Sequence, residues 1–350
     1  MDLKKIEEIL KEEPAYRLKQ VKKALFEDLV ENWEGATTLP KALREKLSES
    51  CPVSEFKSEK VLASKDNKTI KALFILKDGS KIESVLMKHE DARRTVCVSS
   101  QAGCAMGCEF CATGQQGFKR NLTVGEITGQ VLYFARLLKK ERVSNIVFMG
   151  MGEPFLNYDN VLEAIRVLND KDGLNIGARH ISISTAGIVE GIKRLADEKL
   201  QINLAVSLHA PEDHLREKLM PINKKDPVEK IIEAVKEYIK KTKRRVMFEY
   251  LMIDGINDSP IQAKELAKVL KGMLCFVNLI SFNPAGHSKF KSSPVSKTKR
   301  FKDVLEKNGI SVTQRYRFGK EIKAACGQLA ACPSEALPCR QAGLAKEERK

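Results

Sequence analysis

Residues 95–111 read TVCVSSQAGCAMGCEFC, a short β-branched run followed closely by three cysteines. The first part, residues 95–99, predicts a buried strand, because valine and threonine favour extended backbone. Cys104, Cys108 and Cys111 then form a CxxxCxxC pattern in the loop behind it. The first residues of the chain show no signal-peptide pattern, so clustered thiols indicate a metal site rather than a disulfide framework.

The sequence on both sides of this loop predicts an α/β fold. Further strands are expected at 145–149, 180–184, 202–207, 246–252 and 276–281. Helical patterns lie near 123–140, 158–169, 188–198, 226–241, 259–271 and 296–308. Six βα units predict a parallel sheet with helices outside, fewer than the eight of a closed barrel. The expected core, residues 94–330, is therefore an open, partial (β/α)6 barrel, although periodicity alone does not exclude a doubly wound sheet.

The remaining segments are expected to be smaller units. Residues 1–50 predict a small N-terminal helical accessory domain, because apolar residues recur there at helical spacing. Residues 51–93 predict a connecting segment with a β-hairpin, in which runs 69–76 and 81–87 flank the turn Asp78-Gly79. Residues 331–350 form a C-terminal tail. No apolar run approaches the roughly 18 residues of a membrane span, so a cytoplasmic protein is expected.

Charge points to a polyanionic partner. The 350 residues contain 61 Lys and Arg against 46 Asp and Glu, a net charge of +15. A surplus of this size favours nucleic acid, although a basic solvated surface would also produce it. Two basic runs stand out, one at 240–245 and one between Gly286 and Lys323, directly before Cys326. The second run is expected to bring phosphates towards Cys326.

Small and polar residues follow most of the predicted strands at their carboxyl ends. Because such ends meet at one edge of a parallel sheet, a shared cavity is expected there. The residues are Gly150, Met151, Gly152, Glu153 and Pro154 after the second strand, Ser184 and Thr185 after the third, Ser207, Leu208 and His209 after the fourth, and Asn283 and Pro284 after the sixth.

The cysteine spacing favours an iron–sulfur cluster over zinc. Structural zinc usually takes four protein ligands, often as two separated CxxC pairs, and no second pair follows here. Three thiolates on a cubane cluster leave one iron open for another ligand. Zinc remains an alternative at this stage, in a non-catalytic RNA-binding protein.

With CxxxCxxC after the first strand of a six-unit array, the chain resembles the radical S-adenosylmethionine (SAM) enzymes. Further motifs along the chain resemble those of the RlmN family, which methylates C2 of adenine in 23S rRNA and tRNA. Its relative Cfr methylates C8, and a Cfr-like activity stays open because the two share these motifs. The motifs are CVSSQAGC (97–104), CATG (111–114), GMGEP (150–154), SLHA (207–210) and AACGQL (324–329).

The resemblance implies a cofactor set and its ligands. A [4Fe-4S] cluster would be held by Cys104, Cys108 and Cys111, and two SAM molecules would be used per turnover. Gly152 and Glu153 would hold the methionine end of SAM. The residues implied for the rest of the SAM pocket are Ser184, Ser207, Leu208, His209 and Asn283.

The resemblance also implies a methyl relay. Cys326 would take a methyl group from one SAM, and the radical made from a second would activate that group for addition to the base. Glu83 would then accept the C2 proton, and Cys97 would attack Cys326 to release the methylated adenine. This route requires the two cysteines to meet in one cavity, with a Cα separation below about 7 Å when they form a disulfide.

Partners follow from the same resemblance. They are 23S rRNA, tRNA and a low-potential electron donor such as flavodoxin or ferredoxin. No membrane association is expected, and the protein is expected to be a monomer. The N-terminal helices are expected to add a second contact with RNA. Four further cysteines inherit no role: Cys51, Cys275, Cys332 and Cys339.

Overall fold

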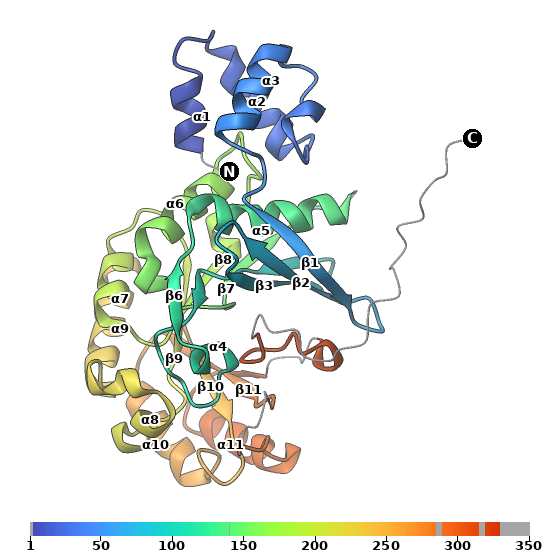
Figure 1. The fold of residues 1–350 in the computed structure, drawn as a ribbon. Helices are drawn as coiled ribbons and strands as arrows, with labels where there is room; N and C mark the ends of the chain where they lie inside the picture. Colours follow the sequence, from blue (N-terminus) through green and yellow to red (C-terminus); the bar gives the residue numbers. More distant parts are fainter. Residues whose placement is uncertain (1–2, 140, 285–288, 315–318, 330–350) are drawn as a thin grey trace.

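A single mixed sheet organises the fold (Figure 1). The computed structural model describes residues 3–139, 141–284, 289–314 and 319–329. Within them, ten strands pair in the order β1-β2-β3-β4-β7-β8-β9-β10-β11-β12. The parallel part contains β4 (Arg94–Cys97), β7 (Asn145–Phe148), β8 (Ile181–Thr185), β9 (Asn203–Ser207), β10 (Val246–Met252), β11 (Cys275–Ser281) and the short β12 (Val312–Gln314). All six strands expected from the sequence are present, within two residues at most ends.

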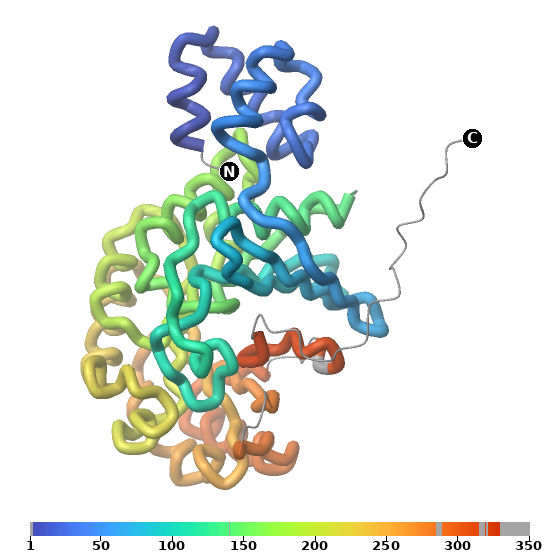
Figure 2. The backbone as a smooth tube through the Cα atoms, viewed as in Figure 1, coloured from blue at the N-terminus to red at the C-terminus, as the bar shows by residue number. Residues whose placement is uncertain are grey.

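Helices cover the outer side of the parallel strands (Figures 1 and 2). They are α5 (Val124–Leu138), α6 (Tyr158–Asn169), α7 (Val189–Ala196), α9 (Val228–Thr242), α10 (Pro260–Leu270) and α11 (Val295–Lys307). Thr123 and Ser259 begin α5 and α10 with capping boxes, in which each side chain accepts an N–H of the first turn. The parallel strands follow chain order without reversal, so the sheet has no switch point of the doubly wound kind. The fold is the partial barrel.

The predicted hairpin is part of the same sheet. β2 (Thr69–Leu76) and β3 (Lys81–Lys88) pair antiparallel, and β3 pairs with β4. A further strand, β1 (Phe56–Ala63), lies at the edge and was not predicted from the sequence. Only one of its eight residues is buried, so the strand lacks the apolar alternation that sequence patterns depend on.

The N-terminal helices build a small apolar core of their own. They are α1 (Leu3–Ile9), α2 (Tyr16–Phe26) and α3 (Lys41–Ser50), at the top of Figure 1. Trp33 is 1% exposed, and its indole N–H donates to the carbonyl of Cys51 at 2.7 Å. Leu132 of α5 joins this core, and Arg136 of α5 donates to the carbonyls of Leu29 and Val30. The helices are therefore fastened to the sheet domain through α5.

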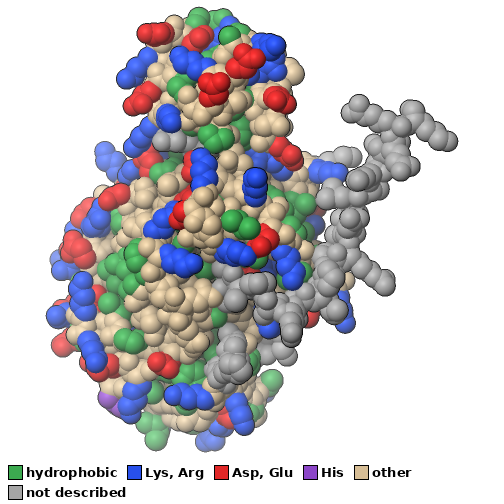
Figure 3. All heavy atoms as spheres, in the orientation of Figure 1, with side chains coloured by type: hydrophobic (Ala, Val, Ile, Leu, Met, Phe, Trp, Pro, Cys, Tyr) green, Lys and Arg blue, Asp and Glu red, His purple; other side chains and the backbone are tan. Residues whose placement is uncertain are grey.

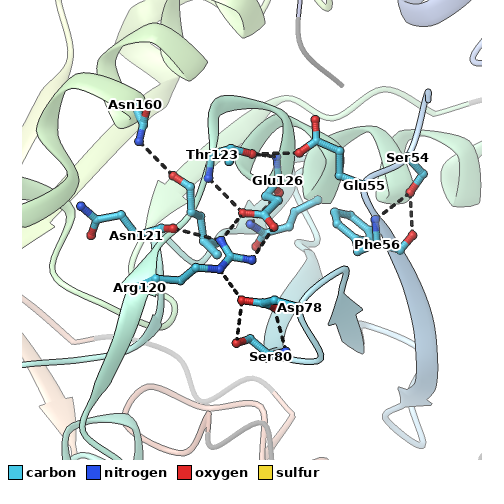
Figure 4. A network of polar contacts seen from close by, with 12 residues as sticks. Ser54, Glu55, Phe56, Asp78, Ser80, Arg120, Asn121, Thr123, Glu126 and Asn160 are labelled. Carbon is cyan, nitrogen blue, oxygen red and sulfur yellow. Dashed lines mark hydrogen bonds and ion pairs between the residues drawn. The ribbon is translucent and has the colours of Figure 1, made fainter. Parts of the chain in front are cut away.

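Short elements frame the cysteine loop. β5 (Gln101–Gly103) and β6 (Phe118–Asn121) pair on either side of it, and α4 (Ala112–Gln115) follows the last cysteine. Figure 4 shows Arg120 of β6 between Asp78 of the hairpin turn and Glu126 of α5. These ion pairs tie the base of the loop to the hairpin and to the first helix.

Among the described residues, no helix is long and apolar enough to cross a membrane. The expected tail at 331–350, with Cys332 and Cys339, and the basic residues Arg315 and Arg317 lie outside the described residues.

Candidate functional site

The two faces of the parallel sheet differ in chemistry. In the strand register, Cys97 of β4 lies between Val85 of β3 and Val147 of β7. The same row of paired residues can be followed across β8, β9 and β10. Side chains alternate along a strand, so one face collects all partners of Cys97. This inner face carries Lys71, Glu83, Cys97, Ser182, Ser184, Ser207 and Glu249, whereas the outer face carries Ile146, Phe148, Ile183, Leu204, Val206 and Phe248 beneath the helices.

The cysteine loop is held in a tight backbone conformation. Gly103 has a φ of +75°, and a Cβ there would lie 2.0 Å from the carbonyl oxygen of Gly117. The amide of Cys104 donates to that same oxygen at 2.9 Å, and the amide of Cys111 donates to the carbonyl of Cys108 at 3.0 Å. Glycine is required at 103 because any side chain would push apart the two strands that close the loop.

The three thiols share one cavity and influence one another. Burial raises the pKa of Cys104 to about 12, and it raises the pKa of Cys108 well above the usual range. The charges of Cys111 and Glu153 raise both values further. Thiolates packed this way need a cationic partner, and a thiol bound to metal is deprotonated outright.

The donor set fits an iron–sulfur cluster by its chemistry. Three cysteine sulfurs face a common space in which the backbone of Gly150 and Gly152 forms another wall. Among the described residues, no three His, Cys, Asp or Glu side chains converge closely enough to hold a metal ion by themselves. Three thiols around a shared cavity are the ligands that a cubane cluster takes.

The cavity lies at the carboxyl ends of the parallel strands and has a volume of about 150 Å³. It contains most of the residues singled out in the sequence: Cys104, Cys108, Cys111, Gly152, Glu153, Ser184, Ser207, His209 and Cys326. Apolar side chains also line the cavity, namely Met106, Phe110, Met149 and Leu251. A small space with converging polar groups is typical of a cofactor site.

Glu153 fastens two strand ends to each other. One carboxylate oxygen accepts the amide N–H of Phe155 at 3.0 Å, and the other accepts that of Ala186 at 2.6 Å. Its own amide donates to the side chain of Gln101 at 2.9 Å. Burial raises the pKa of Glu153 to about 7, against the lowering effect of these hydrogen bonds. Glu153 therefore connects the loops after β7 and β8 through its carboxylate, and it contacts the segment after β4 through its backbone amide.

His209 is a buried neutral imidazole. Its Nδ1 accepts the amide N–H of Leu251 at 3.1 Å, and its ring packs edge-on against Phe110, with centroids 4.9 Å apart. Burial lowers its pKa to about 3, helped by the nearby charge of Arg216. With Nδ1 as an acceptor, the ring proton is on Nε2.

Glu249 is a site residue that the sequence analysis missed. It accepts the hydroxyl of Ser184 at 2.6 Å and that of Ser207 at 3.2 Å, and it lines the cavity. The sequence did contain a signal for Glu249, because it is the single acid in the otherwise apolar strand VMFEYLM. A charged side chain on a buried strand indicates that this face of the strand is polar. The two predicted serines thus belong to a network centred on β10.

Arg216 of α8 (Asp213–Leu219) is a second missed residue. It is fully buried, and its guanidinium donates to the carbonyls of Ala186 and Leu208 and to the side chain of Asn223. Burial lowers its pKa to about 10, while the neighbouring Cys108 works in the opposite direction. Arg216 therefore joins the loops after β8 and β9 behind the cavity.

Cys326 lies on a tight turn that is hydrogen-bonded to the end of the cysteine loop. The amide of Gln328 donates to the carbonyl of Ala325 at 3.1 Å, which closes a four-residue turn. Gly327 is the third residue of this turn and has a φ of +80°, the positive value that a type II turn requires there. The carbonyl of Gly327 accepts the amide of Ala112 at 2.9 Å. Two parts of the chain more than 200 residues apart thus meet at the cavity.

Four predicted site residues do not line this cavity. Leu208 is fully buried in the main core, and Asn283 donates its side-chain amide to the carbonyl of Ser281 at 3.2 Å. Cys97 and Glu83 are buried on the inner face of β4 and β3. β4 lies beside β7, whose carboxyl end forms part of the cavity, and β3 lies one strand further out.

Comparison with known proteins agrees with this geometry. The model of the Radical SAM superfamily matches residues 98–267, from the cysteine loop to α10. A crystal structure described as a radical SAM methyltransferase from Sphaerobacter thermophilus superposes with a TM-score of 0.92 at 46% sequence identity. The match covers 95% of this chain and 98% of that one.

Curated relatives match over nearly the whole chain. A protein of Symbiobacterium thermophilum named "Probable dual-specificity RNA methyltransferase RlmN" is 47% identical over 319 residues, covering 91% of this chain and 86% of the relative. A protein of the same name from Clostridium tetani is 49% identical over 317 residues, covering 91% and 90%. At this coverage the matches extend well beyond residues 98–267 of the radical SAM region.

Proposed function

Because this chain belongs to the RlmN family of radical SAM enzymes, we propose that it methylates C2 of adenine in 23S rRNA and in tRNA. The observation that carries the proposal is the cavity in which Cys104, Cys108, Cys111 and Cys326 meet. Membership in the radical SAM superfamily leaves the zinc-bearing, non-catalytic alternative without support.

The cavity residues divide between the two cofactors of the family, a [4Fe-4S] cluster and SAM. Cys104, Cys108 and Cys111 would hold the cluster. When bound, the cluster supplies the electron that splits SAM into methionine and a 5′-deoxyadenosyl radical. The backbone at Gly152, together with Glu153, would bind the methionine end of SAM, and the Ser184–Ser207–Glu249 network would face its sugar.

Cys326 would carry the methyl group. Its turn places it at the cavity, where its sulfur can act first as a nucleophile towards SAM and later as the link to the base. Cys97 would resolve that link by attacking Cys326. Glu83, two residues along β3 from the partner of Cys97, would accept the C2 proton.

Charge would guide the RNA. Lys289, Lys291, Lys299 and Arg300 lie on or just before α11, in the basic run that precedes Cys326. Figure 3 shows acidic and basic side chains interspersed over the N-terminal helices. We expect α11 to supply phosphate contacts and the N-terminal helices to add a second grip, so deleting residues 1–50 should weaken RNA binding.

The remaining partners follow from the chemistry. Reductive splitting of SAM needs a low-potential donor of the flavodoxin or ferredoxin class. An enzyme acting on rRNA and tRNA would work in the cytoplasm, and one chain supplies every residue of the proposed site, so a monomer is expected.

The experiment is anaerobic reconstitution with iron and sulfide, followed by SAM, a reductant and a 23S rRNA fragment. Mass spectrometry of the digested RNA identifies the product. 2-Methyladenosine is expected, 8-methyladenosine would indicate the Cfr-like activity, and unmodified adenosine despite SAM splitting would contradict the proposed substrate.

The relay predicts a specific phenotype for Cys326→Ala. Methyl transfer should be lost, because the substitution removes the thiol that would carry the methyl group, while SAM splitting persists. Cys275→Ala is the matched control, since Cys275 is a buried thiol on β11 outside the cavity. Full RNA methylation by Cys326→Ala would rule out the relay.

A further inference from the structure

A buried ion pair lies on the inner face of the hairpin, beside the proposed site. Lys71 on β2 and Glu83 on β3 are 7% and 4% exposed, and the ammonium lies 2.8 Å from the carboxylate. Register pairs Lys71 with Val85, and Val85 with Cys97, so the lysine is in the same row as the proposed resolving cysteine. Glu83 is its diagonal neighbour across the strand pair.

The same ammonium reaches the turn segment that carries Cys326. Lys71 Nζ donates to the main-chain carbonyl of Lys323 at 3.1 Å. Lys323 has a φ of +51°, and the amide of the next residue, Ala324, donates to the carbonyl of Gly319 at 3.0 Å. Lys71 thus holds a left-handed backbone position three residues before the methyl-carrying thiol.

Stability alone is a poor explanation for this arrangement. A buried ion pair often adds little to stability over an apolar pair of the same size, because both charges lose their hydration. Here the cation makes two contacts that differ in kind, one to the proposed proton acceptor and one to the segment bearing Cys326. The second contact joins elements that are 252 residues apart in sequence.

We propose that Lys71 is a positioning residue that sets the proton acceptor Glu83 and the Cys326 turn relative to each other. The inference rests on the proposed function, since it assigns no chemistry to Lys71 itself. Its ammonium fixes the carboxylate on the inner face and the Lys323 carbonyl beside it. Proton removal from the base joined to Cys326 depends on both groups being in place.

The test uses the reconstituted holoenzyme with SAM, reductant and the rRNA fragment. Lys71→Met keeps much of the length of the side chain and removes both polar contacts. Formation of 2-methyladenosine should fall by about 10- to 100-fold, the size of effect that misplacing a catalytic group produces. SAM splitting should continue, and protein joined covalently to RNA should accumulate on denaturing gels. Lys71→Arg should restore most of the activity.

A matched control lies on the same hairpin. Lys81 on β3 pairs with Glu59 at 2.8 Å, but this ion pair is about one-third exposed and lies at the hairpin-turn end of the strand. Lys81→Met should therefore behave as wild type. The double variant Lys71→Met/Glu83→Gln should lose less activity than the product of the two single losses, because Lys71 acts partly through that carboxylate.

Folding is checked separately in each variant by iron content and by hydrogen exchange of residues 319–329. Faster exchange there in Lys71→Met, with normal iron content, supports the proposal. Wild-type product release by Lys71→Met, while Glu83→Gln is impaired, would overturn it and leave the proposed function intact. Additive losses in the double variant would also overturn it. No 2-methyladenosine from the wild-type enzyme would instead count against the proposed function.

Discussion

At the scale of single residues, Glu153 combines deep burial with two accepted backbone hydrogen bonds. Burial is the larger effect, because it raises the pKa from 4.5 to about 7. The carboxyl group therefore binds its proton more tightly in the folded chain than in the unfolded one. Its contribution to stability is complete below pH 4.5 and is lost as the pH rises through about 7.

We expect this pH dependence to be measurable in the chain without cluster or SAM. Relative to Glu153→Gln, the free energy of unfolding of the wild type should fall by about 3 kcal/mol between pH 4.5 and pH 7.5, since a pKa difference of one between the folded and unfolded chain corresponds to about 1.4 kcal/mol. Denaturant unfolding across this range measures the difference. His209 has the opposite dependence, because its pKa is lowered, and comparing the two proteins cancels that effect. If the free energy of unfolding changed equally with pH in the wild type and in Glu153→Gln, the raised pKa of Glu153 would be contradicted.

At the scale of elements, the cysteine loop depends on the contact between β5 and β6. Gly103→Ala should distort the loop, since its Cβ would collide with the carbonyl of Gly117 and displace the amide of Cys104. Iron bound per chain after reconstitution should drop well below the wild-type value.

Gly272→Ala separates this collision from backbone strain. Gly272 has a φ of +77°, close to that of Gly103, but a Cβ added there would meet no atom within 4 Å. The substitution should cost only the roughly 1–2 kcal/mol of a left-handed alanine and leave iron binding unchanged. Equal iron loss in both variants would mean that strain, not the collision, matters.

Elements with a strong local pattern were predictable from the sequence. The β-branched run at 180–184 predicted β8, and the helical pattern near 123–140 predicted α5. The edge strand β1 was missed because its charged side chains hide the alternation. Leu208 was expected in the cavity as part of the SLHA motif, yet it follows β9 directly and is buried in the core, whereas Ser207 lines the cavity. The contact of Lys71 with Lys323 has no local signal, because it exists only in the folded chain.

At the scale of the whole molecule, the net charge of +15 should govern RNA binding. Lys299 and Arg300 are exposed on α11, and each phosphate contact contributes about 0.7–0.9 to the slope of log K against log salt. Replacing both with Gln should reduce that slope by about 1.4–1.8, as measured by filter binding from low to moderate salt.

The control for this prediction removes the same charge elsewhere. Lys230 and Lys236 are exposed on α9, outside the basic run that precedes Cys326. Replacing them with Gln should leave the slope nearly unchanged. Equal reductions in the two double variants would show that RNA senses only the total charge, and that α11 is not a binding surface.

The position of the Cys326 turn has a consequence for biosynthesis. Each parallel strand pairs with the one made just before it, so the barrel can assemble in the order in which the ribosome releases it. The turn is made near the end, yet it docks on Ala112 and Lys71, which were made early. The three thiols of the cysteine loop therefore leave the ribosome long before Cys326, the proposed methyl carrier. If the proposed roles hold, a nascent chain would be able to acquire its metal centre before it can modify RNA.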